Sequence, residues 1–401
     1  MKKYLCLILI IAFTFGCSSD RQEDVNDDLP CIDVTKNYPE KEIILTDIAD
    51  VTFLCLNSDN DDFLYGLQSM RHVAKNTIVI IDKRSGRIMF FSKDGTPKSL
   101  FNHKGQGPQE YTNVIGLMYD EDADEVFIVL YSRVIQVYSS TGEYKRKIIL
   151  PKESGVSIDN HDNESLFLHD FSFLNIPGKK RGVEEENDYP VHSYNHPFVR
   201  ISKIDGKVLD YVKVPFNETK LAAQMVYDDG TIDSVTIPYY SVINTKKGLL
   251  LSNPETDTIF LYDKNKNLTP VICKTPLVKD LDPMVVISFF LDYDEYQFFD
   301  ICTVQHVMKL PRRFPIKPLA RNKKTGEVFL QKITLPDYKG KEFLVGLGVS
   351  RIYEEGVFFE LELTELKQAY IENRLSGKLK ELVGTLDEYV DNNVFMLVDF
   401  K

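Results

Sequence analysis

The chain is short of positive charge. Its 401 residues contain 48 lysines and arginines against 60 aspartates and glutamates, which gives a formal net charge of -12. The phosphates of nucleic acid need a cationic partner, and an anionic membrane surface likewise attracts basic segments. The composition therefore argues against nucleic acid as a partner and against direct electrostatic adhesion to a membrane.

Long apolar runs are absent beyond the N-terminus. No stretch after residue 16 approaches the ~18 uninterrupted apolar residues of a membrane helix. The one apolar run covers residues 4–15, follows the basic start Met1-Lys2-Lys3, and is too short to span a bilayer. These are the proportions of a secretory signal. We predict a signal peptide over residues 1–16 and no second membrane segment.

Motifs of catalysis and metal binding are also missing. The sequence has no Cys-x-x-Cys, no His-Glu-x-x-His and no Gly-x-Ser-x-Gly phrase. The closest histidine pairs are His161 with His169 and His192 with His196, which we expect in polar inter-strand loops rather than at zinc. The acidic runs at residues 59–62 and 120–125 are expected to be solvated hairpin turns rather than calcium sites. We predict no metal, no cofactor and no catalytic residue.

Cysteines are few. Of the six, Cys6 lies in the signal peptide and Cys17 directly follows it, which leaves Cys31, Cys55, Cys273 and Cys302. In an exported protein these four allow three disulfide connectivities. Because a chain of about 385 residues builds a core large enough to do without covalent cross-links, we expect free buried thiols instead.

What the chain does contain is β-structure with an internal repeat. Short runs rich in Val, Ile, Phe and Tyr alternate with polar turns, and one phrase recurs: an apolar strand, a polar turn ending in Gly or Asn, then another strand. The turn positions are 95, 142, 206, 267 and 326, about 47 to 64 residues apart. This spacing is near that of a four-stranded propeller blade. Five copies and one further blade's length of chain predict six blades.

The last blade is expected to join the two ends of the chain. A strand near 43–45 or 51–56 would pair with the final run at about 393–400, which removes the exposed edges of an open ring. Three segments interrupt the β-pattern. Residues 219–227 are weakly helical, residues 292–301 suggest a short helix or an irregular loop, and residues 362–390 give the strongest helix signal. Gly377 and Gly384 are expected to split that last helix, which we expect to pack on the propeller rather than to bind a partner.

The phrase Thr14-Phe15-Gly16-Cys17, followed by a polar acidic stretch, resembles the lipobox of bacterial lipoproteins. The resemblance implies acylation of Cys17, cleavage before it, and a tether over residues 17–31. The alternative is an ordinary signal peptide with a chance cysteine. The acidic tether is similar to signals that export such lipoproteins, which implies the outer membrane of the cell envelope, on its periplasmic or surface side.

At residues 105–111 the chain resembles the six-bladed β-propeller lipoproteins of gut-dwelling diderm bacteria, whose signature is Gly-x-Gly-Pro-x-Glu-Tyr. The matching positions are Gly105, Gly107, Pro108, Glu110 and Tyr111. The resemblance implies an all-β, six-bladed propeller over residues 32–401 with a C-terminal helical appendage. We expect the five residues to form a structural joint between blades. A cradle for an anion is the alternative.

Function is predicted only by class. A rigid disc that presents loops and a funnel favours a membrane-anchored binding module for a glycan, a peptide or an envelope protein. The competing hypothesis is an extracytoplasmic enzyme on a propeller scaffold, such as a glycoside hydrolase, lyase or peptidase. A third is a structural subunit of an envelope complex.

Overall fold

The structure is a computed structural model. It describes residues 29–58, 61–66, 69–150, 156–170, 196–215, 222–226, 232–236, 239–254, 256–305, 314–346, 351–353 and 356–401. Cys17, the predicted signal peptide and most of the predicted tether fall outside these ranges. Within them, no helix has the length and apolar character needed to cross a membrane.

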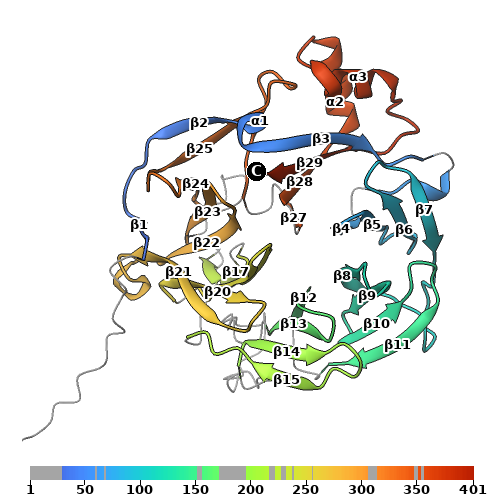
Figure 1. Cartoon of the computed structure of the whole chain (residues 1–401), viewed down its shortest axis with the longest axis horizontal. Coiled ribbons are helices and arrows are strands. Elements are labelled where there is room, and N and C mark those ends of the chain that lie inside the picture. Colours follow the sequence, from blue (N-terminus) through green and yellow to red (C-terminus); the bar gives the residue numbers. More distant parts are fainter. Residues whose placement is uncertain are drawn as a thin grey trace, which may run out of the picture.

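The described strands form a ring of six blades around a central axis (Figure 1). Blade 1 consists of β4 (Met70–Val73), β5 (Thr77–Ile81), β6 (Ile88–Ser92) and β7 (Pro97–Phe101). Blade 2 consists of β8 (Val114–Asp120), β9 (Glu125–Leu130), β10 (Val134–Tyr138) and β11 (Tyr144–Ile149). Blade 3 consists of β12 (Val156–Asn160), β13 (Ser165–Asp170), β14 (Phe198–Ser202) and β15 (Val208–Tyr211).

Each of the other three blades also contains one strand from the N-terminal part of the chain, and blade 6 contains the C-terminal strand as well. Blade 4 consists of β18 (Val242–Thr245), β19 (Gly248–Leu251), β20 (Thr258–Asp263) and β21 (Leu268–Thr275), with β1 (Cys31–Asp33) added outside. Blade 5 consists of β22 (Val285–Asp292), β23 (Tyr296–Thr303), β24 (Ile316–Asn322) and β25 (Val328–Thr334), with β2 (Glu40–Ile44) and β26 (Glu342–Phe343) added to β25. Blade 6 consists of β27 (Arg351–Tyr353), β28 (Gly356–Leu361), β29 (Val394–Phe400) and β3 (Ala49–Cys55).

The hydrophobic core is divided into layers between neighbouring blades. The middle strands β5, β6, β9 and β10 are buried almost throughout because the adjacent blade covers each face. One cluster joins blades 1 and 2, and others join each further pair around the ring, including blades 6 and 1. The outer strands, such as β11, instead alternate between buried or partly buried and exposed side chains. The apolar runs in the sequence are therefore mainly the middle strands of blades.

The repeated phrase marks the turn between the third and fourth strands of blades 1 to 5. Gly95, Gly142, Gly206 and Gly326 have φ values of 91°, 87°, 73° and 75°, a region that glycine adopts without steric cost. The prediction for blade 4 was wrong by one residue, because Lys266 takes the positive φ of 67°. Asn267 instead donates its backbone and side-chain N–H groups to the Asp263 carboxylate.

The two ends of the chain meet in blade 6. Of the two N-terminal segments considered, β3 pairs with β29 over its whole length, from Ala49–Phe400 to Cys55–Val394. The other segment lies in β2 and runs parallel to β25. A belt from β1 through β2 and α1 (Leu45–Ile48) to β3 thus follows the rim across blades 4, 5 and 6 (Figure 1).

The expectation of four free thiols was wrong for one pair. Cys31 and Cys273 form a disulfide, with 4.4 Å between their Cα atoms. Parallel pairing of β1 with β21 places these two cysteines in register, and neither the sequence distance nor the core size reveals that proximity. Cys55 and Cys302 form no disulfide.

Two of the three expected interruptions are strands. Residues 222–226 form β16, which pairs with β17 (Ile232–Thr236) in a hairpin between blades 3 and 4. Residues 292–301 complete the β22–β23 hairpin, where Tyr293 and Phe298 stack against Phe400 of blade 6. Packing between blades, which local propensity does not contain, decides that segment.

The third segment is helical as expected. It forms α2 (Leu363–Ile371) and α3 (Gly377–Thr385), which lie outside the ring beside blade 6 (Figure 1). Leu366 and Leu379 are fully buried in the cluster shared with blades 5 and 6. Gly377 begins α3 with a φ of 53°, whereas Gly384 remains inside that helix. The apolar stripe is thus used for packing on the propeller.

Candidate functional site

The two faces of the ring are built from different connections. Because neighbouring strands of a blade are antiparallel, the turns from the first to the second strand and from the third to the fourth lie at one end of the blade. The turn from the second to the third strand and the connection to the next blade lie at the opposite end. The first end, the short-turn face, has tight turns such as 93–96 and 121–124. The second end, the long-loop face, carries the 102–113 connection, the β16–β17 hairpin and the helices α2 and α3. Long loops on a rigid scaffold are where recognition concentrates.

Polar and charged contacts, between blades and within blade 2, hold the short-turn face together. The Lys203 ammonium of blade 3 contacts the Asp120 carboxylate of blade 2, with side chains 3% and 6% exposed. Glu121 accepts hydrogen bonds from Thr77 Oγ1 and the Asn76 N–H of blade 1. Arg146 binds both oxygens of Glu125 at 2.6 Å. The acidic run at 120–125 is a hairpin turn, but its expected solvation was wrong at Asp120.

The signature loop, residues 105–111, joins blade 1 to blade 2 on the long-loop face. The Gly105 N–H donates to the Tyr111 carbonyl, and the Gly107 N–H donates to Glu110 Oε2 at 2.7 Å. A Cβ on Gly105 would lie 2.0 Å from Glu110 Oε2, so a side chain there would displace the carboxylate. Because both glycine N–H groups are already used, they do not form an anion cradle.

Three aromatic and amide side chains hold the signature loop in place. Tyr111 is 1% exposed, donates its hydroxyl to the Gly86 carbonyl and accepts the His103 N–H. Burial raises the pKa of Tyr111 to about 12. From β10, Tyr138 donates to the Gln109 carbonyl, and Gln136 donates to the carbonyls of residues 108 and 110. The loop is thus bonded to both blades that it connects.

The joint gives a test of the signature glycine. We expect Gly105→Ala and Glu110→Ala each to lower the free energy of unfolding by about 1 kcal/mol, because each removes the acceptor from the Gly107 N–H. The double variant should lose about as much as either single variant, since both act on one contact. Urea unfolding measures all three. The exposed neighbour Gln109→Ala is the control, and fully additive losses would contradict the shared contact.

Two pockets lie on either side of the signature loop. The blade-1 pocket, about 550 Å³, is lined among others by Lys83, Lys104 and Asn113, and the blade-2 pocket, about 310 Å³, by Ser132, Gln136 and Lys147. Gln106 and Thr112 line both pockets. The loop therefore forms the ridge between two adjacent depressions.

Most polar side chains of these pockets have no hydrogen-bond or ion-pair partner among the described residues. Five side chains make no hydrogen bond or ion pair to any residue that the structure describes: Lys83, Gln106, Thr112, Ser132 and Lys147. Gln136 is 4% exposed, and its Oε1 atom has no hydrogen-bond partner there. A buried acceptor without a donor is costly. The two pockets therefore offer hydrogen-bonding capacity to a ligand.

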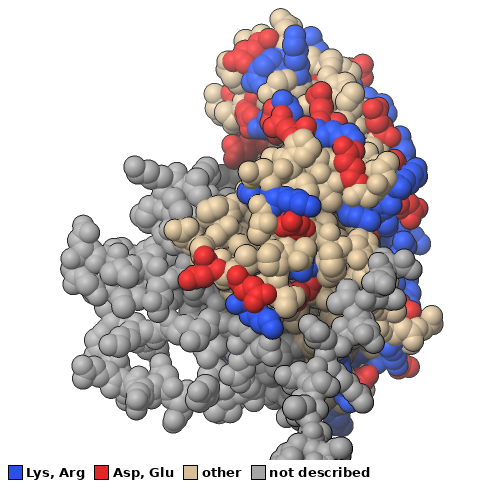
Figure 2. Space-filling view, turned by 90° about the vertical axis from the view of Figure 1, so that its left-hand side faces the viewer, with Lys and Arg blue, Asp and Glu red and all other residues tan. Residues whose placement is uncertain are grey.

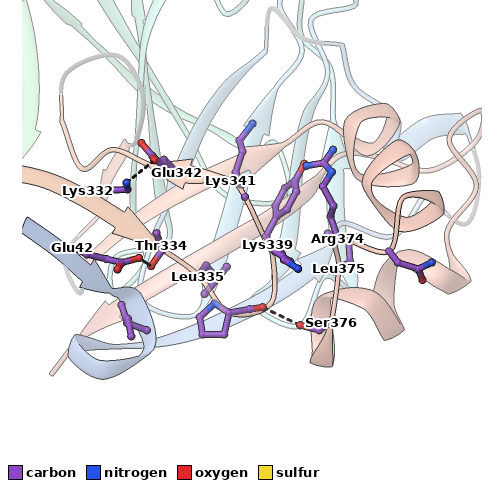
Figure 3. Close-up of a pocket in the computed structure, with 15 residues that line it drawn as sticks. Glu42, Lys332, Thr334, Leu335, Lys339, Lys341, Glu342, Arg374, Leu375 and Ser376 are labelled. Atoms are coloured by element: carbon purple, nitrogen blue, oxygen red, sulfur yellow. Dashed lines mark hydrogen bonds and ion pairs between the residues drawn. The ribbon is translucent and has the colours of Figure 1, made fainter.

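A third pocket, about 530 Å³, lies where blade 5 meets the helices (Figure 3). Its polar side chains are mostly paired with one another: Lys332 with Glu342, Thr334 with Glu42, and Ser376 with the carbonyl of residue 336. Arg374 and Lys341 lie over the Tyr338 ring and pair with Glu372 and Glu365. These contacts join the helices to blade 5, so we regard this pocket as a structural seam.

The charge on the outer rim is mixed. Figure 2 shows Lys and Arg side chains intermixed with Asp and Glu on the edge that carries β1 and β2. On that edge Lys41 pairs with Glu327, and Lys332 pairs with Glu40. The described part of this edge therefore carries charges of both signs side by side.

The described histidines on which the sequence analysis focused pack against aromatic rings. Among the described residues no group of three His, Cys, Asp or Glu side chains could hold an ion. His161 lies in the β12–β13 turn and stacks on Tyr262. The expectation of a polar loop was wrong for His169, which is 2% exposed within β13 and stacks on Phe198. His192 lies outside the described residues.

Buried His169 makes folding dependent on pH. Burial lowers its pKa to about 3, whereas an unfolded histidine has a pKa of about 6.5. Below pH 6.5 the unfolded chain binds a proton that the folded chain does not, so stability present at neutral pH is lost on acidification. Between pH 7.5 and 5.0 we expect His169→Gln to lose about 2 kcal/mol less than the wild type. Urea unfolding at both pH values measures this, and equal losses would contradict it.

Sequence patterns did not identify most of the pocket residues. Ser132 lies in the β9–β10 turn, Gln136 in the middle strand β10 and Lys147 in the outer strand β11. Only the pairing of β10 with β11 places Gln136 opposite Lys147. No motif marks these positions. The signature phrase located the ridge between the pockets but not their walls.

Comparison with known proteins supports the fold. A family model described as a six-bladed β-propeller matches residues 20–189. A candidate exported protein from Bacteroides fragilis has a solved structure with 13% sequence identity and a TM-score of 0.57, and the alignment covers 90% of this chain and 99% of that one. A member of the DUF4221 family from Bacteroides vulgatus has 12% identity and a TM-score of 0.47, with coverage of 88% and 97%. No curated protein matches the chain.

Proposed function

We propose that this protein is an exported, lipid-anchored binding module whose ligand binds the long-loop face above blades 1 and 2. The observation that carries the proposal is the polar lining of the blade-1 and blade-2 pockets, which we call the two loop pockets. Most of its lysine, amide and hydroxyl side chains are not used toward the described residues, the exceptions being Lys104, Tyr111 and the Gln136 amide nitrogen, whereas most of the polar groups in the pocket between blade 5 and the helices pair with one another. Binding sites typically combine a preformed hollow with a few convergent polar groups.

Export and anchoring rest on the N-terminal sequence. The signal-like run ends at Gly16-Cys17, and the structural neighbour from Bacteroides fragilis is itself a candidate exported protein. An acylated Cys17 would hold the propeller at a membrane, since two or more acyl chains give stable anchoring. Cys17→Ser should release the protein into the soluble fraction of its host, and retention of that variant in the membrane would refute the anchor.

The ligand class we favour is a glycan. Neutral hydroxyl and amide groups beside lysine suit the dense hydroxyls of a sugar, and the long-loop face offers them from two blades. A peptide or an envelope protein is the other class to test.

The test is thermal melting of the chain from Ser18 onward against separate panels of glycans and peptides. A ligand at ~100 times its dissociation constant adds about 2.7 kcal/mol, which we expect to raise the midpoint by a few degrees for one class. Thr112→Ala should reduce the shift, whereas Thr325→Ala on the short-turn face should not. A shift that is unchanged in Thr112→Ala would place the binding site elsewhere.

A further inference from the structure

The two loop pockets differ from the whole protein in charge. The chain as a whole is acidic, yet the pockets are lined by Lys83, Lys104 and Lys147. The nearby carboxylates are already engaged. Glu110 accepts the Gly107 N–H, and Asp82 accepts the Ser85 hydroxyl and the Arg84 N–H.

The lysines are available to a ligand to different degrees. Lys104 donates to the Arg84 carbonyl at 2.6 Å, while Lys83 and Lys147 have no partner among the described residues. One of these two lines each pocket, so unpaired positive charge flanks the signature loop on both sides.

The blade-2 pocket has a buried acceptor in its lining, and an exposed tyrosine lies next to the lining residues in the sequence. Gln136 presents an Oε1 atom that no donor from the described chain reaches. Tyr131 is 74% exposed and lies between the pocket residues Leu130 and Ser132. Its N–H donates to the Asn113 carbonyl, which fixes the β9–β10 turn beside the end of the 102–113 connection.

We propose that the two loop pockets bind an acidic oligosaccharide, with Lys83 and Lys147 contacting its anionic groups. This inference rests on the proposed function and specifies its ligand. The hydroxyl groups of a sugar can donate the hydrogen bond that Gln136 Oε1 does not receive from the described residues. The exposed tyrosine ring is a broad, rigid contact surface for the apolar face of a sugar ring. Anionic groups at two positions along the ligand would meet one free ammonium in each pocket. Carboxylate and sulfate groups share this chemistry.

The experiment is calorimetric titration of the full chain in detergent with three trisaccharides of similar size. They are a galacturonate trimer, a sulfated galactose trimer and a neutral galactose trimer. We expect at least one acidic trimer to bind at least tenfold more tightly than the neutral one at 50 mM NaCl. The difference should shrink at 500 mM NaCl because salt screens exposed charges. The preferred acidic trimer distinguishes carboxylate from sulfate.

Variants on exposed positions locate the site. Lys147→Gln and Lys83→Gln should each weaken the acidic trimer about fivefold, and Tyr131→Ala should weaken all trimers that bind. The matched control is Lys207→Gln, whose side chain is 82% exposed on the short-turn face and which should leave binding unchanged.

Two results would overturn the inference while leaving the proposed function in place. One is equal affinity for neutral and acidic trimers. The other is a peptide that raises the melting temperature of the wild type but not of Thr112→Ala, while no trimer binds. Binding of an acidic trimer that is unchanged in both Lys147→Gln and Lys83→Gln would also overturn it. No melting shift with any glycan or peptide would refute the proposed function itself.

Discussion

Replacement of Cys31 by serine is expected to lower the free energy of unfolding by several kcal/mol. The Cys31–Cys273 disulfide joins residues 242 positions apart, and the chain-entropy model assigns about 5 kcal/mol to a loop of this length. The strand that it anchors, β1, has only three residues. Without the bond, we expect β1 to separate from blade 4 first. The separation should then spread along the belt to β2 on blade 5 and β3 on blade 6.

Urea unfolding of the wild type and of Cys31→Ser, each with and without a reducing agent, tests this expectation. Reduction should lower the midpoint of the wild type to that of the variant and leave the variant unchanged, because Cys55 and Cys302 form no disulfide that a reducing agent could break. Limited proteolysis should cut Cys31→Ser in residues 31–44 earlier than the wild type. Equal midpoints under oxidising conditions would show that the disulfide contributes nothing to stability.

Replacement of Lys203 by methionine is expected to cost about 3 to 5 kcal/mol. The Lys203 ammonium and the Asp120 carboxylate are almost fully buried between blades 2 and 3, and removal of one partner leaves a buried charge without compensation. The Lys203 carbonyl also accepts a hydrogen bond from Arg146 Nε at 2.8 Å. That backbone contact remains in the variant, so the loss reports the side chain.

The double variant Lys203→Met/Asp120→Leu separates the charge from the packing. We expect it to recover most of the lost stability in urea unfolding, because two apolar side chains of similar volume carry no desolvation cost. Lys207→Met is the control, since its pair with Asp205 is exposed and such pairs contribute ~1 kcal/mol or less. A double variant as unstable as Lys203→Met would show that packing, not the unpaired carboxylate, causes the loss.

These contacts divide the propeller into a fixed face and an available face. On the short-turn face, carboxylates and cations of neighbouring blades satisfy one another, as Lys203 and Asp120 do. On the long-loop face, the signature loop is bonded to both of its blades, through the Tyr111 hydroxyl to blade 1 and through Gln136 to blade 2. Polar side chains such as Lys147 have no partner among the described residues. A rigid ridge beside such side chains suits recognition, since little order is lost when a ligand binds.

The blade count was accessible from the sequence because it depends on local turn chemistry, whereas only the structure chose β3 over the segment at 43–45 as the partner of the C-terminal strand. A hairpin turn requires positive φ, and glycine marks that requirement at Gly95, Gly142, Gly206 and Gly326. Helical spacing in residues 362–390 was equally local. The shift from Asn267 to Lys266 shows the limit of this signal, since both residues fit a polar turn and the Asp263 hydrogen bonds select between them.

By itself, then, the sequence determined the six blades, the closing strand at the C-terminus and the glycine-rich joint at Gly105. Tertiary structure decided the rest: the partner of Cys31, the strand at residues 292–301, the burial of His169 and the walls of the loop pockets. Each depends on residues from different blades or from opposite ends of the chain. A repeat with a strong local turn signal specifies what each blade is, whereas contacts between blades follow from the order and register in which the ring assembles.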